Sequence, residues 1–239
     1  MNREEAVLRE LNLYPLWQRR GQPAPVVAPV GAPATAAAEI AVHPDGSRAQ
    51  LVGGRGWPEL KEMVRDCTAC ALRAGCTQTV FGVGDEKADW LFVGEGPGAD
   101  EDAQGEPFVG QAGKLLDNML AAIRLKRGNN VYIANIVKCR PPGNRTPHAD
   151  EIATCMPYLQ RQIELMQPRL IVALGKTAAA SLLARDDSLA SLRGTLHDYR
   201  GIPLIVTYHP AYLLRTPLDK AKVWQDLCMA VATMNAAAP

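Results

Sequence analysis

Short apolar segments alternate with amphipathic segments along most of the chain. Four apolar segments are continuous enough to be strands buried on both faces: DWLFV at 89–93, VYIANIV at 131–137, RLIVAL at 169–174 and PLIVTY at 203–208. Segments with helical spacing lie between these strands and after the last one, at 112–125, 149–166, 177–185 and 220–234. This alternation predicts a three-layer α/β/α fold around a central, mostly parallel sheet of about four strands.

The first 55 residues do not follow this alternation. Residues 1–20 place apolar side chains near helical spacing, which predicts a short helical segment interrupted by Pro15. Residues 21–55 are rich in Pro and Ala, and this composition predicts a disordered linker. The N-terminal segment has two interpretations of equal weight, which are docking on the body of the protein and binding a partner protein. The globular domain is expected at residues 56–236.

The composition is that of an ordinary globular protein. With 239 residues, 47% of them apolar, and a net charge of +1, the chain can form one good core and is not strongly basic. No apolar run is long enough to cross a membrane, and the first residues are acidic and polar, unlike a signal peptide. We expect a cytoplasmic, monomeric protein that does not bind membranes. In that reducing compartment its six cysteines are expected to be thiols or metal ligands.

Four loops follow the carboxyl ends of the predicted strands, where parallel α/β proteins place their functional residues. They cover residues 94–110, 138–146, 175–176 and 208–215. The first loop begins GEGPGADED, whose glycine spacing does not match the dinucleotide fingerprint and whose acids would repel a pyrophosphate. A nucleotide site is therefore disfavoured. Two interpretations remain, a glycine-rich turn with capping acids and a backbone that closely approaches a neutral ring beside a carboxylate.

Two of the other loops are basic. NIVKCRPPGNRTPH (135–148) combines cations with prolines and has no acid, and YHPAYLLRTP (208–217) places a histidine close after a strand. Basic loops beside an acidic pocket favour a polyanion whose bound group is neutral, such as nucleic acid with one extracted base. The candidate phosphate contacts are Lys138, Arg140, Arg145, Lys176 and Arg215. Leu213 or Leu214 is the candidate wedge for the gap that the extracted nucleotide leaves.

The cysteines have an uneven spacing. Cys67 and Cys70 form a CxxC pair, whereas Cys139 and Cys155 stand alone. Zinc ribbons generally pair two CxxC knuckles, so this is a weak zinc pattern, while an iron–sulfur cluster needs only four converging sulfurs. The spacing favours metal binding without choosing the metal. The remaining two, Cys76 and Cys228, are interpreted as small apolar side chains.

Four motifs together resemble the family 4 uracil-DNA glycosylases, the iron–sulfur members of that superfamily. They are GEGPGADED, EPFVGQAGKLLD, NIVKCRPPGNRTP and HPAYLLR, in this order, and the similarity covers about residues 57–234. The resemblance implies an enzyme that flips uracil out of DNA and hydrolyses its N-glycosidic bond, leaving an abasic site. It also implies a 4Fe-4S cluster on Cys67, Cys70, Cys139 and Cys155.

The resemblance further implies roles for individual residues. The implied substrate contacts are Glu95, Gly96, Glu101, Phe108, Asn135 and His209. His209 would donate to uracil O2 as negative charge accumulates, Asn135 would read the base edge, and Phe108 would stack on the flipped ring. Glu101 would form the pocket wall and screen the 5-position or orient water, so the implied catalytic residues are His209, Asn135 and Glu101. By residue type alone, each of these also suits an ordinary structural position.

The acids beside Glu101 and the alternative to an enzyme lead to two further expectations. Asp100 and Asp102, on either side of Glu101, are expected to form a solvated face. The alternative to an enzyme is a non-catalytic iron–sulfur module that binds DNA or senses redox state. The expected partner is uracil-containing DNA.

Overall fold

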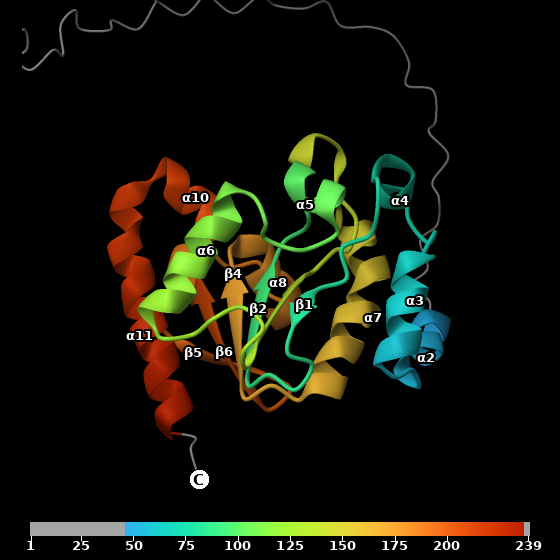
Figure 1. Ribbon diagram of the computed structural model, residues 1–239. Coiled ribbons are helices and arrows are strands. Elements are labelled where there is room, and N and C mark those ends of the chain that lie inside the picture. The colour runs from blue at the N-terminus through green and yellow to red at the C-terminus, as the bar shows by residue number, and fades with distance from the viewer. Residues whose placement is uncertain (1–45, 237–239) are drawn as a thin grey trace, which may run out of the picture. The chain divides into compact units, whose positions relative to one another are not determined.

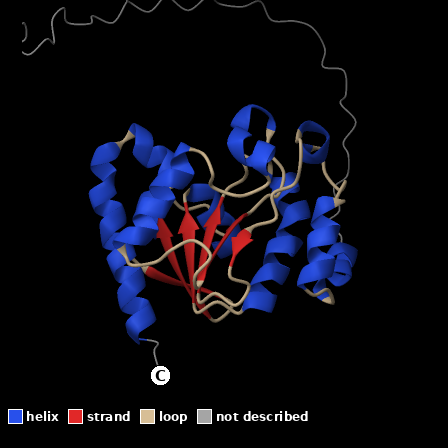
Figure 2. Ribbon diagram, in the orientation of Figure 1, coloured by secondary structure: helices blue, strands red, loops and turns tan. Residues whose placement is uncertain are grey.

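The computed structural model describes residues 46–236. The helical segment expected at 1–20 lies outside the described residues, as does most of the linker expected at 21–55. In the described part, helices cover both faces of a central sheet (Figures 1 and 2), which confirms the predicted α/β/α fold. Among residues 46–236, no helix combines the length and the hydrophobicity that a transmembrane span requires.

The sheet has six strands in the order β1-β3-β2-β4-β6-β5. Their bounds are Val83–Gly84 (β1), Trp90–Gly94 (β2), Val131–Asn135 (β3), Leu170–Leu174 (β4), Leu196–Tyr199 (β5) and Ile202–Thr207 (β6). The four predicted strands are β2, β3, β4 and β6, and they pair in parallel at the centre. β1 and β5 add antiparallel edges. The sequence did not predict these edges because β1 has two residues and β5 is largely polar and partly exposed.

The helices follow the strands in the predicted alternation. Their bounds are Gly46–Gly53 (α2), Trp57–Arg65 (α3), Leu72–Gly75 (α4), Ala99–Gln104 (α5), Gln111–Ala122 (α6), Ala149–Met166 (α7), Lys176–Leu183 (α8), Leu189–Leu192 (α9), Pro210–Arg215 (α10) and Lys220–Ala236 (α11). Two short 3₁₀ turns are Pro142–Asn144 (η1) and Pro217–Asp219 (η2). Helix α2 occupies the end of the expected linker, packs on α7 and buries Val52. The folded body therefore begins before residue 56.

Alternating side chains of the strands build two hydrophobic layers. In β2, Leu91 and Val93 pack into the layer that also contains buried residues of α3, α7 and α8. Trp90 and Phe92 point to the other face and pack with buried residues of α6 and α11. Because both faces are covered, the central strands are fully buried and read as continuous apolar runs.

The parallel strands end at the same edge of the sheet. Gly94 at the end of β2 pairs with Asn135 at the end of β3, and Leu174 of β4 pairs with Thr207 of β6. The four loops singled out from the sequence leave from these ends, so the fold brings them together. Neighbouring parallel strands with connections on opposite faces create a crevice at this edge.

Candidate active site

One cavity of ≈ 840 Å³ lies among these loops. The six residues expected to contact the substrate all line it: Glu95, Gly96, Glu101, Phe108, Asn135 and His209. They come from segments more than 100 residues apart, and the parallel strand ends place them around one space. Three of the expected phosphate contacts also line the cavity, namely Arg145, Lys176 and Arg215.

Asn135 offers an unused hydrogen-bonding group to this cavity. Its side chain is 2% exposed, and its Oδ1 atom is buried without a hydrogen-bond partner. A buried polar atom without a partner is costly, so native proteins keep such atoms mainly where a ligand or water satisfies them. Gly94 allows this arrangement, because a Cβ there would overlap both Asn135 Oδ1 and the ring of Phe108. Gly94 belongs to the first motif, but the sequence reading drew attention to Gly96.

Phe108 has an unusual backbone conformation. Its φ of 57° lies in the left-handed region, which costs free energy for a residue with a side chain. Arg127 holds this conformation, donating from Nη1 to the Pro107 carbonyl at 2.7 Å and from Nη2 to the Phe108 carbonyl at 2.7 Å. Gly113 is needed as well, because a Cβ there would overlap the Phe108 carbonyl. Arg127 lies in none of the four motifs, which is why sequence reasoning missed it.

The ring of Phe108 lies beside His209. The two ring centroids are 5.4 Å apart, with a 31° angle between the planes. His209 follows β6 and precedes α10, and its Nδ1 accepts a hydrogen bond from the Ala211 amide at 3.2 Å. An accepting Nδ1 in a neutral imidazole assigns the proton to Nε2. His209 can therefore offer a neutral N–H donor.

The protonation state of His209 follows from its surroundings. Burial, and to a smaller extent the positive charge of Arg215, lower its pKa to about 4 against the opposing effect of Glu101. The imidazole is therefore neutral at physiological pH. A neutral donor can stabilise developing negative charge through its dipole and does not need to transfer a proton.

The lowered pKa predicts a pH-dependent stability. The unfolded imidazole takes up a proton near pH 6.5, whereas the folded one does so only near pH 4. As the pH falls through this window, protonation favours the unfolded chain, by up to about 3 kcal/mol. Between pH 7 and pH 4.5 the wild-type Tm should therefore fall by roughly 5–10 °C more than that of His209→Asn. Equal decreases in the two proteins would contradict this assignment.

Glu101 organises the glycine-rich loop. Its Oε2 accepts from the Gly98 amide at 3.0 Å, and its Oε1 accepts from the amides of Val109 and Gly110 at 2.9 and 3.1 Å. The carboxylate thus joins the start of α5 to the segment after Phe108. These three amides occupy most of its acceptor capacity.

The two acids beside Glu101, Asp100 and Asp102, differ in their exposure to solvent. Asp100 is exposed, as expected for a solvated face. The same expectation is wrong for Asp102, which is 5% exposed and accepts from the Thr77 amide at 2.9 Å and the Gln78 amide at 3.4 Å. An acid in a short polar run can face inward when backbone amides satisfy its charge, and sequence pattern does not reveal those amides.

Glu95 is held by a residue that the sequence reading did not identify. Its carboxylate accepts a hydrogen bond from the Thr177 hydroxyl in the first turn of α8. Its backbone carbonyl accepts from the Val137 amide at 3.1 Å, which continues the pairing of β2 and β3 past the strand ends. Glu95 thereby connects the cavity wall to α8.

The cations at the cavity differ in how they are paired. Arg145 forms a bidentate pair with Glu151 at 2.7 and 2.8 Å, and Lys176 lies 2.9 Å from Asp186. Arg215 is exposed and makes no ion pair within residues 46–236. Arg140 does not line the cavity and donates to Asn144 Oδ1 at 2.7 Å. Arg215 is thus the most available cation of this group.

The prediction that Lys138 and Leu213 contact DNA is wrong, because both side chains are buried. Lys138 is 1% exposed, and its Nζ donates to Gln162 Oε1 at 2.7 Å and to the Asn135 carbonyl at 3.0 Å, so it cannot reach a phosphate. Burial lowers its pKa to about 8, against the opposing effect of Cys155. Leu213 is 1% exposed and packs in the core, whereas Leu214 is 46% exposed. Of the two candidate wedges, only Leu214 is accessible.

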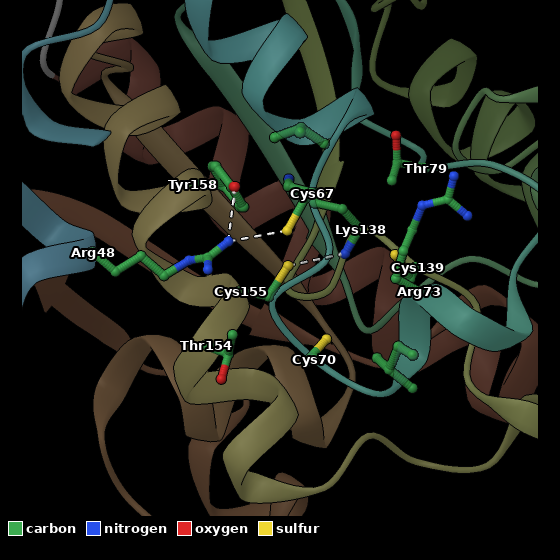
Figure 3. A pocket seen from close by; sticks show the side chains of 12 residues that line it. Arg48, Cys67, Cys70, Arg73, Thr79, Lys138, Cys139, Thr154, Cys155 and Tyr158 are labelled. Atoms are coloured by element: carbon green, nitrogen blue, oxygen red, sulfur yellow. Dashed lines mark hydrogen bonds between the residues drawn. The ribbon is translucent and has the colours of Figure 1, made fainter. Parts of the chain in front are cut away.

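A second, much smaller cavity, of ≈ 10 Å³, is lined by four cysteines, Cys67, Cys70, Cys139 and Cys155. Figure 3 shows their sulfur atoms facing a common space. Cys76 and Cys228 do not line it. All six cysteines are free thiols.

The surroundings of this cavity favour the thiolate of Cys67 and oppose ionisation of the other three cysteines. Cys67 Sγ accepts from Arg48 Nη2 of α2 at 3.0 Å, and Cys155 Sγ accepts from the Lys138 amide at 3.3 Å. Burial opposes ionisation of Cys67, but hydrogen bonds with Tyr158 and the Ala69 amide and the charge of Arg48 outweigh it and lower its pKa. Burial raises the pKa of Cys155 to about 11.

The arrangement bears on which metal the cysteines could hold. Within the part of the chain that the structure describes, no three or more His, Cys, Asp or Glu side chains converge closely enough for one metal ion. The four cysteines nevertheless line one cavity, and thiolates of this kind can ligate either zinc or an iron–sulfur cluster.

Comparisons with known proteins bear on the family of the chain. Residues 81–228 match the model of the uracil DNA glycosylase superfamily. The chain is 41% identical to a type-4 uracil-DNA glycosylase of Pyrobaculum aerophilum, over 72% of this chain and 91% of the relative. It is 44% identical to one of Archaeoglobus fulgidus (66% of this chain, 84% of the relative) and 46% identical to one of Thermotoga maritima (65% and 82%).

Proposed function

The chain belongs to the uracil-DNA glycosylase superfamily, and from that premise we propose that it excises uracil from DNA in the cavity between Asn135 and His209. The observation that carries this proposal is the pairing of two complementary groups in one cavity. Asn135 presents a buried acceptor without a partner, and His209 presents a neutral donor. Phe108 lies beside His209 as an apolar surface on which a planar base can stack.

Asn135 supplies discrimination between bases. Its amide can donate to uracil O4 and accept from the N3–H group, which would satisfy its free Oδ1. Cytosine presents a donor and an acceptor in the opposite order, so both hydrogen bonds would be mismatched in a buried site. Such a mismatch discriminates by roughly 10⁴-fold or more.

His209 supplies the main stabilisation of the transition state. Cleavage of the N-glycosidic bond leaves an oxocarbenium-like sugar and an anionic uracil. The Nε2–H group of His209 would donate to uracil O2 as this charge develops, while the Ala211 amide keeps Nδ1 in its accepting role. A preorganised donor in a water-poor site is effective because it need not reorganise during the reaction.

Neither of the two glutamates that line the cavity is free to act as a base for the attacking water. Glu101 is engaged by three loop amides, and Glu95 is engaged by Thr177. We infer that the sugar cation is stabilised mainly by the DNA phosphates and nearby acids, and that Glu101 contributes by shaping the pocket wall. Its replacement should therefore reduce activity modestly instead of abolishing it.

We also propose that the four-cysteine cavity holds a 4Fe-4S cluster. The convergence of Cys67, Cys70, Cys139 and Cys155 on one space and the similarity to type-4 relatives support this proposal. When bound, the cluster would supply a structural cross-link between the segment after α3, the basic loop and α7. The purified protein should then be brown and contain about four irons and four sulfides per chain.

DNA would be held by cations at the mouth of the cavity. Arg145, Lys176 and Arg215 lie there, with Arg140 on the neighbouring loop. Leu214 is placed to enter the gap that the flipped nucleotide leaves. With a net charge of only +1, nonspecific binding should be weak and should decrease further as salt is raised.

The proposed activity can be tested with an oligonucleotide that contains one deoxyuridine. Incubation followed by alkali should break the strand at that position, and strands that carry cytosine or thymine there should stay intact. A brown protein that binds the oligonucleotide without producing abasic sites would instead support a non-catalytic iron–sulfur module.

Replacing Arg127 should weaken base stacking without touching the cavity. Arg127→Met removes both hydrogen bonds that hold the left-handed Phe108 backbone, and kcat/KM on deoxyuridine should fall by about 10- to 100-fold. Asp117→Asn is the matched control, because Asp117 Oδ1 lies 3.1 Å from both Nε and Nη2 of Arg127 and its replacement keeps the two donors to the Pro107 and Phe108 carbonyls. Equal activity of both variants would contradict the role of Arg127.

A further inference from the structure

Lys138 lies between the two cavities. It lines the four-cysteine cavity, its amide donates to Cys155 Sγ at 3.3 Å, and it directly precedes Cys139. Its side chain extends toward the end of β3, where Nζ donates to the carbonyl of Asn135 at 3.0 Å. One buried residue thus contacts both a cysteine ligand candidate and the residue that faces the base.

The charge of Lys138 lacks a carboxylate partner. It takes part in no ion pair within the described residues 46–236, although it is 1% exposed. A buried ammonium without an anion is strongly unfavourable. Lys138 lines the cysteine cavity, where thiolates or an anionic cluster would supply the missing negative charge.

The Asn135 carbonyl accepts a hydrogen bond from a side chain at the end of β3. Past this point the Ile136 and Val137 amides bond to the carbonyls of Gly94 and Glu95, which continues the pairing with β2. The ammonium of Lys138 satisfies that carbonyl, and it therefore fixes the peptide from which the Asn135 side chain extends. Misplacement of such a group by a fraction of an ångström is enough to weaken catalysis.

Gln162 of α7 fixes the other side of the ammonium. Its Oε1 accepts from Lys138 Nζ at 2.7 Å, while its Nε2 donates to the Phe81 carbonyl at 3.0 Å. Gln162 is fully buried, and its donor end is already engaged. The amide is therefore oriented to present an acceptor to Lys138.

We propose that Lys138 is a positioning residue that couples the two cavities: its ammonium is the counter-charge of the anionic occupant of the cysteine cavity, and the same group holds Asn135 in place for base recognition. The second half of this inference rests on the proposed function, because it concerns the base contact of Asn135. The first half concerns the cluster and can be measured without any activity.

The test compares holoprotein variants by three measurements. These are the rate at which the visible absorption of the cluster decays in the presence of an iron chelator, the reduction potential of the cluster, and kcat/KM on a deoxyuridine oligonucleotide. Lys138→Met should accelerate the decay, lower the reduction potential and reduce kcat/KM by about 10- to 100-fold. Lys87→Met, at an exposed position, is the matched control and should behave as wild type.

A second variant separates the two roles and avoids loss of the buried side chain. Gln162→Glu keeps the shape and the hydrogen bond to Lys138 and gives the ammonium a protein carboxylate as its counter-ion. It also loses the donor to the Phe81 carbonyl, so the reduction potential, which responds to charge, is the deciding measurement for this variant. The cluster should then decay faster and have a lower reduction potential, while kcat/KM per cluster-loaded molecule should stay within a few-fold of wild type. This variant decides the inference even if Lys138→Met cannot be purified with its cluster.

Two results would overturn the inference. Unchanged cluster decay and reduction potential in Gln162→Glu would remove the counter-charge role. A Lys138→Met holoprotein with wild-type kcat/KM would remove the positioning role. Failure of the proposed function is distinguishable, because the wild-type protein would then release no uracil while the cluster measurements would still respond to the two variants.

Discussion

Replacing His209 with alanine should lower kcat for uracil release by about 10²- to 10³-fold, the cost of removing one preorganised donor from a developing anion. The structure supports this magnitude because the imidazole is neutral, its Nδ1 is engaged by the Ala211 amide and its ring lies beside Phe108. Single-turnover kinetics on a deoxyuridine oligonucleotide would measure the chemical step separately from product release.

Two controls sharpen the His209 experiment. His197 lies on β5, away from the cavity, and its side chain bonds to the Leu192 carbonyl of α9. His197→Ala should therefore keep near wild-type kcat. In the wild-type enzyme, the single-turnover rate should show no transition from His209 between pH 5.5 and pH 8, because its pKa is about 4. A His209→Ala variant within a few-fold of wild type would show that another group stabilises the leaving base.

Removing the side chain of Asn135 should have the largest effect on recognition. Asn135→Ala loses both contacts to the base edge, and kcat/KM on uracil should fall by about 10³- to 10⁴-fold. The preference for uracil over cytosine should fall with it, since the only buried amide acceptor without a partner at this strand end is gone. Competition between deoxyuridine and deoxycytidine oligonucleotides would measure both quantities.

The matched control for Asn135 is an exposed asparagine. Asn118→Ala changes an exposed position of α6 and should leave both quantities unchanged. Retained discrimination in Asn135→Ala would mean that backbone groups of the glycine-rich loop read the base, in which case the role of Asn135 would be structural.

The four central strands were predictable because the requirement for burial on both faces shows directly in their own short segments of sequence. Strands buried on both faces must be continuously apolar, so the sequence revealed β2, β3, β4 and β6 directly. The edges β1 and β5 carry no such requirement and were missed. Helix α2 was also missed, because a composition rich in Pro and Ala before it extended the expected linker too far.

The site was predictable where motif and strand end coincide. The six expected substrate contacts line one cavity because each lies at or just past the end of a central strand or on the loop that follows. Exposure within a loop was not predictable. Lysine and leucine in a basic loop are typical of DNA contacts, but Lys138 and Leu213 are both buried. The ammonium of Lys138 bonds to the Asn135 carbonyl, and Leu213 packs against core side chains.

Helix α2 has a practical consequence for any shortened version of this protein. A fragment beginning at Trp57 would retain the residues of the base pocket and the four cysteines but lose the guanidinium of Arg48, which donates to Cys67 Sγ. A fragment cut to residues 81–228 would also lose Cys67 and Cys70. If the cysteines hold the proposed cluster, the first fragment should bleach faster than the longer chain during aerobic handling and the second should not hold the cluster, so the residues from Gly46 onward should be retained for spectroscopy and crystallisation.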